Sequence, residues 1–371
     1  MFAGKISPVC LCIFVHIVQS RKIEPGRPEP FCREPSTDCQ CVPFYQCATN
    51  TFNTGGSVLI DKRFGQHPCT DSVEVCCNDV LPSGDVTTVK PKVSKKKCGH
   101  RNDGGLGFKI LGSEDKNAGF AEFPWMVALL EIVTFSEEQH KFFQCGGSLI
   151  HDRVVLTAAH CVYNKSIESL IVRAGEWDTQ TSGEPLPNQD RKVSQVIIHE
   201  DYKKESLIND VALVVTEEPF SFTDNVQIVC LPKSTVVQND EKCIASGWGK
   251  DKFGKEGRYQ VVLRKLTLPI VGNERCQEKL RETRLGHGFR LHDTFMCAGG
   301  VAQEDTCEGD GGGPLICPTG SSPSQYFQAG IVAWGINCGG EMPGVYVSVA
   351  KFKNWIDAQM GHLNFEKLYD Y

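Results

Sequence analysis

Short apolar runs separated by turn residues dominate the chain from Cys98 onward. The runs are rich in Val, Ile and Leu, and they include residues 125–130, 154–157, 193–198 and 211–215. This pattern predicts an all-β barrel or sandwich. A helix is predicted only over residues 349–360, where apolar residues recur on one face, at Phe352, Trp355, Ile356 and Met360.

A separate apolar run near the N-terminus spans residues 8–18, after Lys5 and before Gln19 and Ser20. A charged start, a short apolar centre and a small residue at the cut are typical of a signal peptide, which we place at 1–20. A membrane anchor is the alternative reading, but it needs roughly 20 apolar residues. No other stretch is long enough to span a bilayer, so we expect a secreted, extracellular protein without a membrane span.

Composition is ordinary for a globular protein, with 40% hydrophobic and 23% charged residues among 371. A net charge of −6 argues against a nucleic acid as partner. The 19 cysteines favour a disulfide framework in an oxidising compartment. Loss of Cys10 and Cys12 with the signal peptide leaves 19 − 2 = 17 cysteines, so at least one is free or pairs between chains.

Seven of these cysteines crowd into residues 32–77, at Cys32, Cys39, Cys41, Cys47, Cys69, Cys76 and Cys77. So short a module buries little core, and disulfides must supply its stability. The vicinal Cys76 and Cys77 are badly placed to bond each other and should reach separate partners. A zinc site is the competing reading, but the module lacks paired C-x-x-C units.

Residues 78–97 read as a linker, with Pro82, Ser83, Gly84 and Pro91 as structure breakers. Five lysines follow within residues 90–97. Such a segment is expected to be solvated and open to proteases. A polyanion-binding patch is the alternative to a plain tether.

Three stretches of the region after the linker carry candidate chemistry. They are Leu-Thr-Ala-Ala-His-Cys at 156–161, Asn-Asp-Val-Ala-Leu at 209–213 and Cys-Glu-Gly-Asp-Gly-Gly-Gly-Pro at 307–314. Together and in this order they resemble the chymotrypsin-like (trypsin) family, from Cys98 to Met360. The resemblance implies a double β-barrel with a C-terminal helix, in a domain that we place at 98–362.

The family's mechanism needs a serine nucleophile, a histidine base and an orienting aspartate. His160 and Asp210 match the last two roles, and Gly311 stands where the family has its serine. Loss of such a member costs on the order of a million-fold in rate, so the resemblance implies a pseudoenzyme. Engineered inactivation is another explanation of Gly311, although alanine is the usual engineered residue. Ala333 also departs from the family, which commonly has a serine there that bonds the aspartate.

The resemblance assigns further residues around this site. Asp305 matches the acid at the base of the trypsin pocket, and Gly335 and Gly344 match the glycines that keep it open. The pocket would accept Lys or Arg, unless Asp305 is a solvated relic. The N–H groups of Gly309 and Gly311 would form an oxyanion hole.

The same resemblance implies a pairing for the remaining ten cysteines. The pairs are Cys98–Cys230, Cys145–Cys161, Cys243–Cys317, Cys276–Cys297 and Cys307–Cys338. The odd thiol then belongs to the N-terminal module.

Activation by cleavage is a further implication. Ile110-Leu-Gly-Ser at 110–113 resembles an altered form of the new N-terminus of the family, with Lys109 before the cut and Asp310 as its partner. A cut there leaves the fragments joined through Cys98–Cys230. Arg101 and the lysine-rich linker are alternative cleavage sites.

Two sites for modification or ligands complete the reading. Asn164-Lys-Ser is a glycosylation sequon. The stretch from Glu176 to Glu184 resembles the calcium loop of some family members and offers oxygen ligands, whereas acidic loops are more often solvated. No cofactor is required, and calcium is the one candidate.

The cysteine-rich module resembles an arthropod clip domain through residues 41–47, residues 59–64, Cys69 and the pair Cys76-Cys77, with one cysteine beyond the usual six. A clip domain before a protease domain with glycine for serine resembles the clip-domain serine protease homologues. That resemblance implies a secreted haemolymph cofactor of innate immunity, which assists prophenoloxidase activation and melanisation after cleavage. Expected partners are prophenoloxidase, an active clip-domain protease or a second copy joined through the odd cysteine. An adhesion or pathogen-recognition protein is the alternative, and an active protease with an unusual nucleophile is the third reading.

Overall fold

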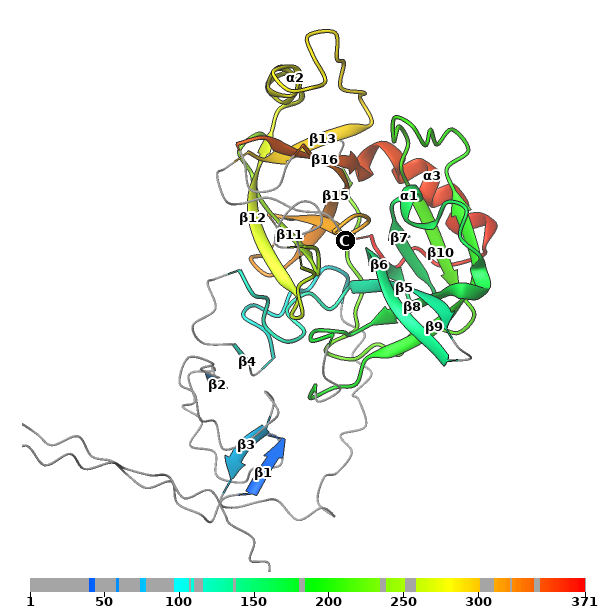
Figure 1. Cartoon of the computed structure of the whole chain (residues 1–371), viewed down its shortest axis with the longest axis vertical. Coiled ribbons are helices and arrows are strands. Elements are labelled where there is room, and N and C mark those ends of the chain that lie inside the picture. The colour runs from blue at the N-terminus through cyan, green and yellow to red at the C-terminus, as the bar shows by residue number, and fades with distance from the viewer. Residues whose placement is uncertain are drawn as a thin grey trace, which may run out of the picture. The chain divides into compact units, whose positions relative to one another are not determined.

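A computed structural model describes residues 40–43, 58–59, 74–77, 97–106, 108–109, 116–135, 138–179, 184–233, 238–250, 258–300, 310–320, 322–336 and 341–370 (Figure 1). The signal segment and the linker up to residue 96 lie outside this part of the chain, as do Cys32, Cys39, Cys47 and Cys69. Every described residue belongs to one compact unit, residues 40–371.

Six antiparallel strands close the first barrel in the order β10-β7-β6-β5-β8-β9. These strands are β5 (Met126–Phe135), β6 (Glu138–His151), β7 (Val154–Thr157), β8 (Leu170–Ala174), β9 (Gln189–Ile198) and β10 (Ala212–Thr216). Each apolar run of the sequence falls on one of them. Val, Ile and Leu fit strands because branched side chains pack well on a pleated surface, and β7 and β10 are buried along their whole length.

A second barrel of six strands has the order β11-β12-β13-β16-β15-β14. It contains β11 (Lys242–Gly247), β12 (Arg264–Val271), β13 (Phe295–Gly299), β14 (Pro314–Pro318), β15 (Tyr326–Trp334) and β16 (Pro343–Ser348). The fold is therefore the expected double barrel rather than a sandwich. One continuous core runs through the first barrel and into the second, with Trp125 and Trp248 almost fully buried.

Helices are few, but there are more than the one predicted. The C-terminal helix α3 (Val349–His362) buries Phe352, Ile356 and Met360 as expected, while Trp355 lies half-buried at its edge. The expectation of a single helix was wrong, because the chain also forms α1 (Ala159–Val162), the 3-10 turn η2 (Ile167–Ser169) and α2 (Asn273–Arg281). Helix α2 escapes sequence inspection because it buries only Cys276 and Leu280. None of the helices in the described ranges has the length and apolar character needed to cross a membrane.

Four short strands lie outside the barrels. β1 (Gln40–Pro43) and β3 (Glu74–Cys77) form an antiparallel pair in which Cys41 lies opposite Cys76. β2 (Val58–Leu59) pairs in parallel with β4 (Phe108–Lys109).

The described residues of the double barrel form four disulfides: Cys98–Cys230, Cys145–Cys161, Cys243–Cys317 and Cys276–Cys297. These are four of the five pairs that the family resemblance implies. Cys307 and Cys338, the fifth pair, lie outside the described residues.

Candidate functional site

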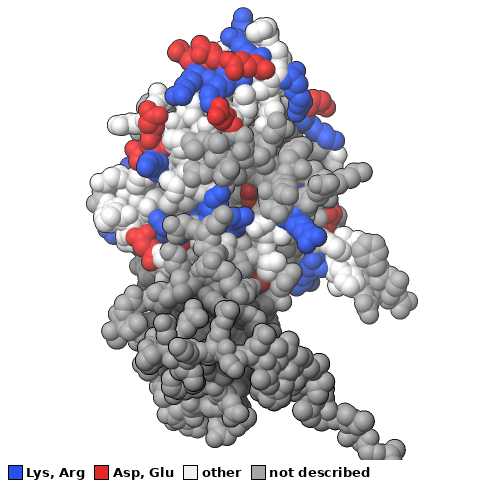
Figure 2. Space-filling model, turned by 60° about the vertical axis from the view of Figure 1, so that its left-hand side comes forward, with Lys and Arg blue, Asp and Glu red and all other residues white. Residues whose placement is uncertain are grey.

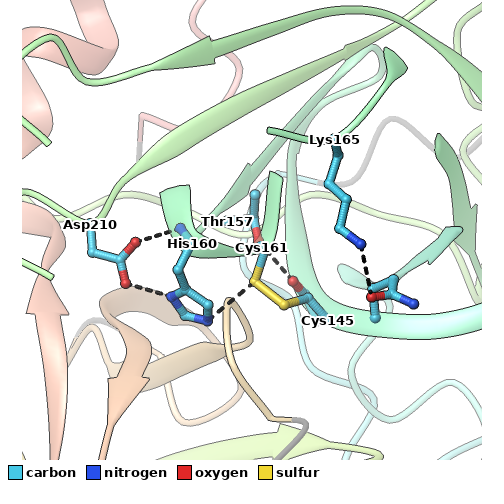
Figure 3. Close-up of a disulfide and its surroundings, with 8 residues drawn as sticks. Cys145, Thr157, His160, Cys161, Lys165 and Asp210 are labelled. Atoms are coloured by element: carbon cyan, nitrogen blue, oxygen red, sulfur yellow. Dashed lines mark hydrogen bonds and ion pairs between the residues drawn. A yellow bond between two sulfur atoms is a disulfide. The ribbon is translucent and has the colours of Figure 1, made fainter. Parts of the chain in front are cut away.

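The first barrel brings His160 and Asp210 together by strand pairing. His160 lies in α1, directly after β7, and Asp210 directly precedes β10, which pairs antiparallel with β7. The end of one strand therefore meets the start of the other. The Nδ1 atom of His160 lies 2.6 Å from Oδ2 of Asp210, and the backbone N–H of His160 donates to Oδ1 at 2.7 Å (Figure 3).

This pairing sets the direction of the imidazole ring. Asp210 is fully buried, and an ionised carboxylate accepts hydrogen bonds but donates none. The proton of a neutral His160 therefore sits on Nδ1, and the lone pair of Nε2 points away from Asp210. Nε2 lies 3.5 Å from Sγ of Cys161 and faces the turn that carries Gly311.

The second barrel supplies that turn, which precedes β14. Its backbone is fixed to both barrels, because Gly146 N–H donates to the carbonyl of Gly311 at 2.9 Å and Gly312 N–H donates to Val332 at 2.9 Å. Gly312 has φ +78°, and a Cβ there would lie 2.3 Å from Oγ1 of Thr157. Only glycine fits at position 312, and because the chain has glycine there, the turn can adopt this conformation.

Gly311 leaves this turn without a nucleophile. A Cβ built on Gly311 would lie 2.7 Å from Nε2 of His160 and 3.8 Å from Sγ of Cys145. The imidazole thus occupies space that a serine side chain would need, and it is held there by Asp210. Among the described residues, the site contains a positioned base with nothing to deprotonate.

Ala333 removes a second polar group from the site. It lies on β15 with 8% exposure and presents only a methyl group. Within the described part of the chain, the hydrogen bonds to the Asp210 carboxylate both come from His160. The hydroxyl of the neighbouring Tyr202 has no hydrogen-bond partner there. Burial, reinforced by the charge of Asp210, raises the pKa of Tyr202 to about 12.

The cysteines beside His160 do not create a metal site. Cys145, His160 and Cys161 are the one cluster in the described ranges whose ligand atoms are close enough to hold an ion. Both sulfur atoms, however, are bonded to each other, and metals bind thiolates rather than disulfides.

The specificity pocket is described only in part. Asp305 and Gly309 lie outside the described residues. Gly335 faces open space, because a Cβ there would meet no atom within 4 Å. Gly344 is buried in β16, opposite Ala298 of β13. These two positions are therefore placed, while the acid that the resemblance assigns to the pocket lies outside the described residues.

Asp310 occupies a notch at the end of β11. Its Oδ1 accepts a hydrogen bond from Gly249 N–H at 2.8 Å. A Cβ on Gly247 or Gly249 would lie 2.2 or 2.4 Å from atoms of the Asp310 side chain, so only glycine leaves room for it. Its expected partner Ile110 lies outside the described residues, and Lys109 is described only as the end of β4.

Arg101 does not fit its alternative role as a cleavage site. Its side chain is 15% exposed and pairs with the fully buried Glu122, which Lys265 also contacts at 2.8 Å. The guanidinium lies 5.2 Å from the ring centre of Phe123 and 5.6 Å from that of Tyr326. Burial opposes its charge, yet Glu122 raises the pKa of Arg101 above its usual range. A protease needs an exposed, extended segment, and Arg101 offers neither exposure nor freedom.

Glu176 and Glu184 form the candidate calcium loop, together with Asp178. All three side chains are at least 92% buried, and Asp178 N–H approaches Oε1 of Glu184 at 3.3 Å. Burial, with a further contribution from Glu184, raises the pKa of Glu176 to about 8. Arg173 and Asn188 each donate to Oε2 of Glu176 at 3.1 Å. Carboxylate oxygens are the ligands that calcium prefers, so this loop remains the candidate for that ion.

Two family models match this chain. A family model described as Trypsin matches residues 111–356, and one described as Serine protease Clip domain PPAF-2 matches residues 29–78. The chain is 48% identical over 298 residues to phenoloxidase-activating factor 2 of Galleria mellonella, over 78% of this chain and 98% of that protein. The chain belongs to the clip-domain serine protease family.

Other members of the clip-domain serine protease family cover most of the chain. It is 38% identical to inactive CLIP domain-containing serine protease A28 of Anopheles gambiae, over 85% of this chain and 87% of that protein. Protein masquerade of Drosophila melanogaster is 35% identical over 67% of this chain, which amounts to 23% of its own length. The resemblance to clip-domain serine protease homologues and the double-barrel fold are confirmed.

Proposed function

We propose that this clip-domain family member is a non-catalytic cofactor that acts in phenoloxidase activation after limited cleavage. The observation that carries the proposal is Gly311, whose missing side chain leaves His160 Nε2 facing a bare turn. The names of two relatives support it, since one is a phenoloxidase-activating factor and another is an inactive CLIP domain-containing serine protease.

In this proposal the barrels serve as a binding platform. The glycine turn and the His160–Asp210 pair keep the shape of a protease site, because backbone contacts to both barrels hold the turn. A partner protein docks on loops around this site, and a Lys or Arg of the partner enters the pocket that Asp305 would close. The clip domain binds a second partner or a like chain through its odd cysteine. The partners are prophenoloxidase or an active clip-domain protease.

Cleavage between Lys109 and Ile110 is the activating step in this proposal. The burial of Arg101 supports it by removing the nearest rival site. The segment before the cut stays anchored to the barrels by Cys98–Cys230 and by Asn102, which donates to the carbonyl of Ala121 at 2.8 Å. The clip domain would therefore stay attached after cleavage.

The proposed setting is extracellular haemolymph, where a disulfide framework persists. A glycan on Asn164 agrees with this setting. Asn164 is exposed and has φ +58°, in the turn between α1 and η2. Calcium held by Glu176 and Glu184 would stabilise the fold and take no part in chemistry.

Reconstitution tests the proposal. The secreted protein, before and after cleavage, is mixed with purified prophenoloxidase and an active clip-domain protease, and phenoloxidase activity is followed. An arginine chromogenic substrate runs in parallel. We expect cleaved protein to raise phenoloxidase activity without hydrolysing the substrate. Unchanged phenoloxidase activity rejects the cofactor role, and binding to bacterial or fungal surfaces then becomes the function to test.

A further inference from the structure

The loop after α2 carries exposed arginines that have no acidic residue beside them in the loop sequence. Between Thr283 and His292 the chain has two arginines and no acidic residue, although its net charge is −6. Arg284 and Arg290 are both exposed. In the described part of the molecule, neither guanidinium makes a hydrogen bond or an ion pair.

Other cations nearby are already engaged. Lys279 donates to the carbonyl of Glu341 at 2.8 Å, and Arg281 donates to the carbonyl of Phe289 at 2.8 Å. These two side chains tie the loop to its surroundings. Arg275, Arg284 and Arg290 are left as exposed charges on α2 and the loop after it. Helix α2 lies at the top of Figure 1, and side chains of both charge signs lie side by side at the top of Figure 2.

The loop is held in one shape. The disulfide Cys276–Cys297 closes its base, and Leu291 N–H donates to Oε1 of Gln277 at 3.0 Å. Phe289 packs edge-on against Trp334 of β15, with ring centres 6.1 Å apart. A loop that is already ordered lowers the entropy lost when a partner binds and leaves mainly the two arginine side chains to be ordered.

We infer that Arg284 and Arg290 form a docking site for an acidic segment of a partner protein. The planar guanidinium binds carboxylates through two parallel hydrogen bonds, so two arginines carried on one ordered loop favour spaced carboxylates. Glu274, Glu278 and Glu282, on α2 and at its end, are also exposed. The surface is therefore mixed in charge, and it repels a densely charged polyanion more strongly than a segment with a few spaced carboxylates. The inference deepens the proposed function. It rests on that function only in the choice of phenoloxidase-cascade proteins as partners to test.

The test uses full-length protein, cleaved and uncleaved, over an immobilised short peptide of alternating Glu and Leu. A Gln–Leu peptide, heparin, prophenoloxidase and an active clip-domain protease are immobilised in parallel. The variant is Arg284→Glu/Arg290→Glu. The matched control is Lys192→Glu/Lys242→Glu, which changes the net charge equally at exposed positions on β9 and β11. Thermal unfolding confirms that each variant is folded.

We expect wild type to bind the acidic peptide and at least one cascade protein, with affinity that falls as salt rises. The loop variant should lose about tenfold or more, because it leaves charges of like sign facing each other, and the control should change little. Equal loss in the control, or no loss in the loop variant, overturns the inference. Tighter binding to heparin than to both the peptide and the cascade proteins also overturns it, in favour of a polyanion site. Peptide binding is read without phenoloxidase, so failure here is distinct from failure of the cofactor role.

Discussion

The two barrels contribute unequally to the degenerate site. The first keeps both of its residues, with Asp210 and His160 joined by contacts of 2.6 and 2.7 Å. The second contributes Gly311 and Ala333, neither of which has a polar side chain. The difference follows from burial. Asp210 is fully buried, so its carboxylate needs hydrogen-bond donors. A side chain at the partly buried position 311 satisfies no such buried group. Glycine at position 311 leaves the turn and its backbone contacts intact, whereas removal of the His160 imidazole should destabilise the first barrel.

Catalysis is where the comparison predicts the largest effect. Cleaved wild type should hydrolyse an arginine chromogenic substrate on the order of a million-fold more slowly than an active relative. Gly311→Ser alone should restore only part of this rate, since its Cβ would crowd Nε2 of His160, 2.7 Å away. Gly311→Ser/Ala333→Ser should restore more. Labelling of wild type by a serine-reactive phosphonate would show a substitute nucleophile and break the comparison.

The free energy of unfolding should show whether the His160–Asp210 pair stabilises the fold. His160→Ala removes the imidazole from the buried Asp210 and leaves its carboxylate only the backbone N–H of residue 160, which should lower the free energy of unfolding by about 1–3 kcal/mol. The measurement is chemical denaturation at neutral pH. His362→Ala, at an exposed position in the last turn of α3, is the control. If both variants unfold alike, the pair is a relic and the comparison fails.

Glu176 is a second buried acid of the first barrel, and its contact with Arg173 offsets only part of the cost of burying its charge. Its pKa of about 8 lies above the value of an unfolded chain, so the folded state holds an extra proton between about pH 4.5 and 8. Stability should therefore fall as pH rises through this window, by an amount on the order of 2–4 kcal/mol.

Calcium and Glu176→Gln should each flatten that pH dependence, because each removes the need for the proton. Thermal unfolding across the pH window, with calcium or with chelator, gives the readout. Asp293→Asn, at a site with an exposed carboxylate, is the matched amide control. If Glu176→Gln flattens the pH profile but calcium leaves it unchanged, Glu176 is the buried acid responsible and the loop binds no calcium.

The smallest effect is expected from Ala333→Ser by itself. The family resemblance implies that a serine hydroxyl at this position would give Asp210 a third hydrogen bond, which should stabilise the fold by about 1 kcal/mol. Ala333→Cys is the control, since its thiol is only a weak donor. Destabilisation by the serine would mean that the second barrel has repacked around the alanine.

Much of this molecule follows from local sequence. Apolar runs gave the barrel strands, and the periodic residues Phe352, Ile356 and Met360 gave α3, because strand and helix periodicities are written in neighbouring residues. The lack of a hydroxyl at position 311 is also a property of the sequence, since glycine has no side chain in any fold. The family resemblance added four cysteine pairs that the structure contains.

Only the tertiary structure decided which charges are usable. Arg101 reads as a cleavage site along the chain, but Glu122 and two aromatic rings bury it. Arg284 and Arg290 read as ordinary loop residues, yet the fold leaves them exposed and unpaired while engaging Lys279 and Arg281. The raised pKa of Glu176 likewise exists only once Glu184 is folded against it. Burial and charge pairing join residues distant in sequence, and no local pattern encodes them.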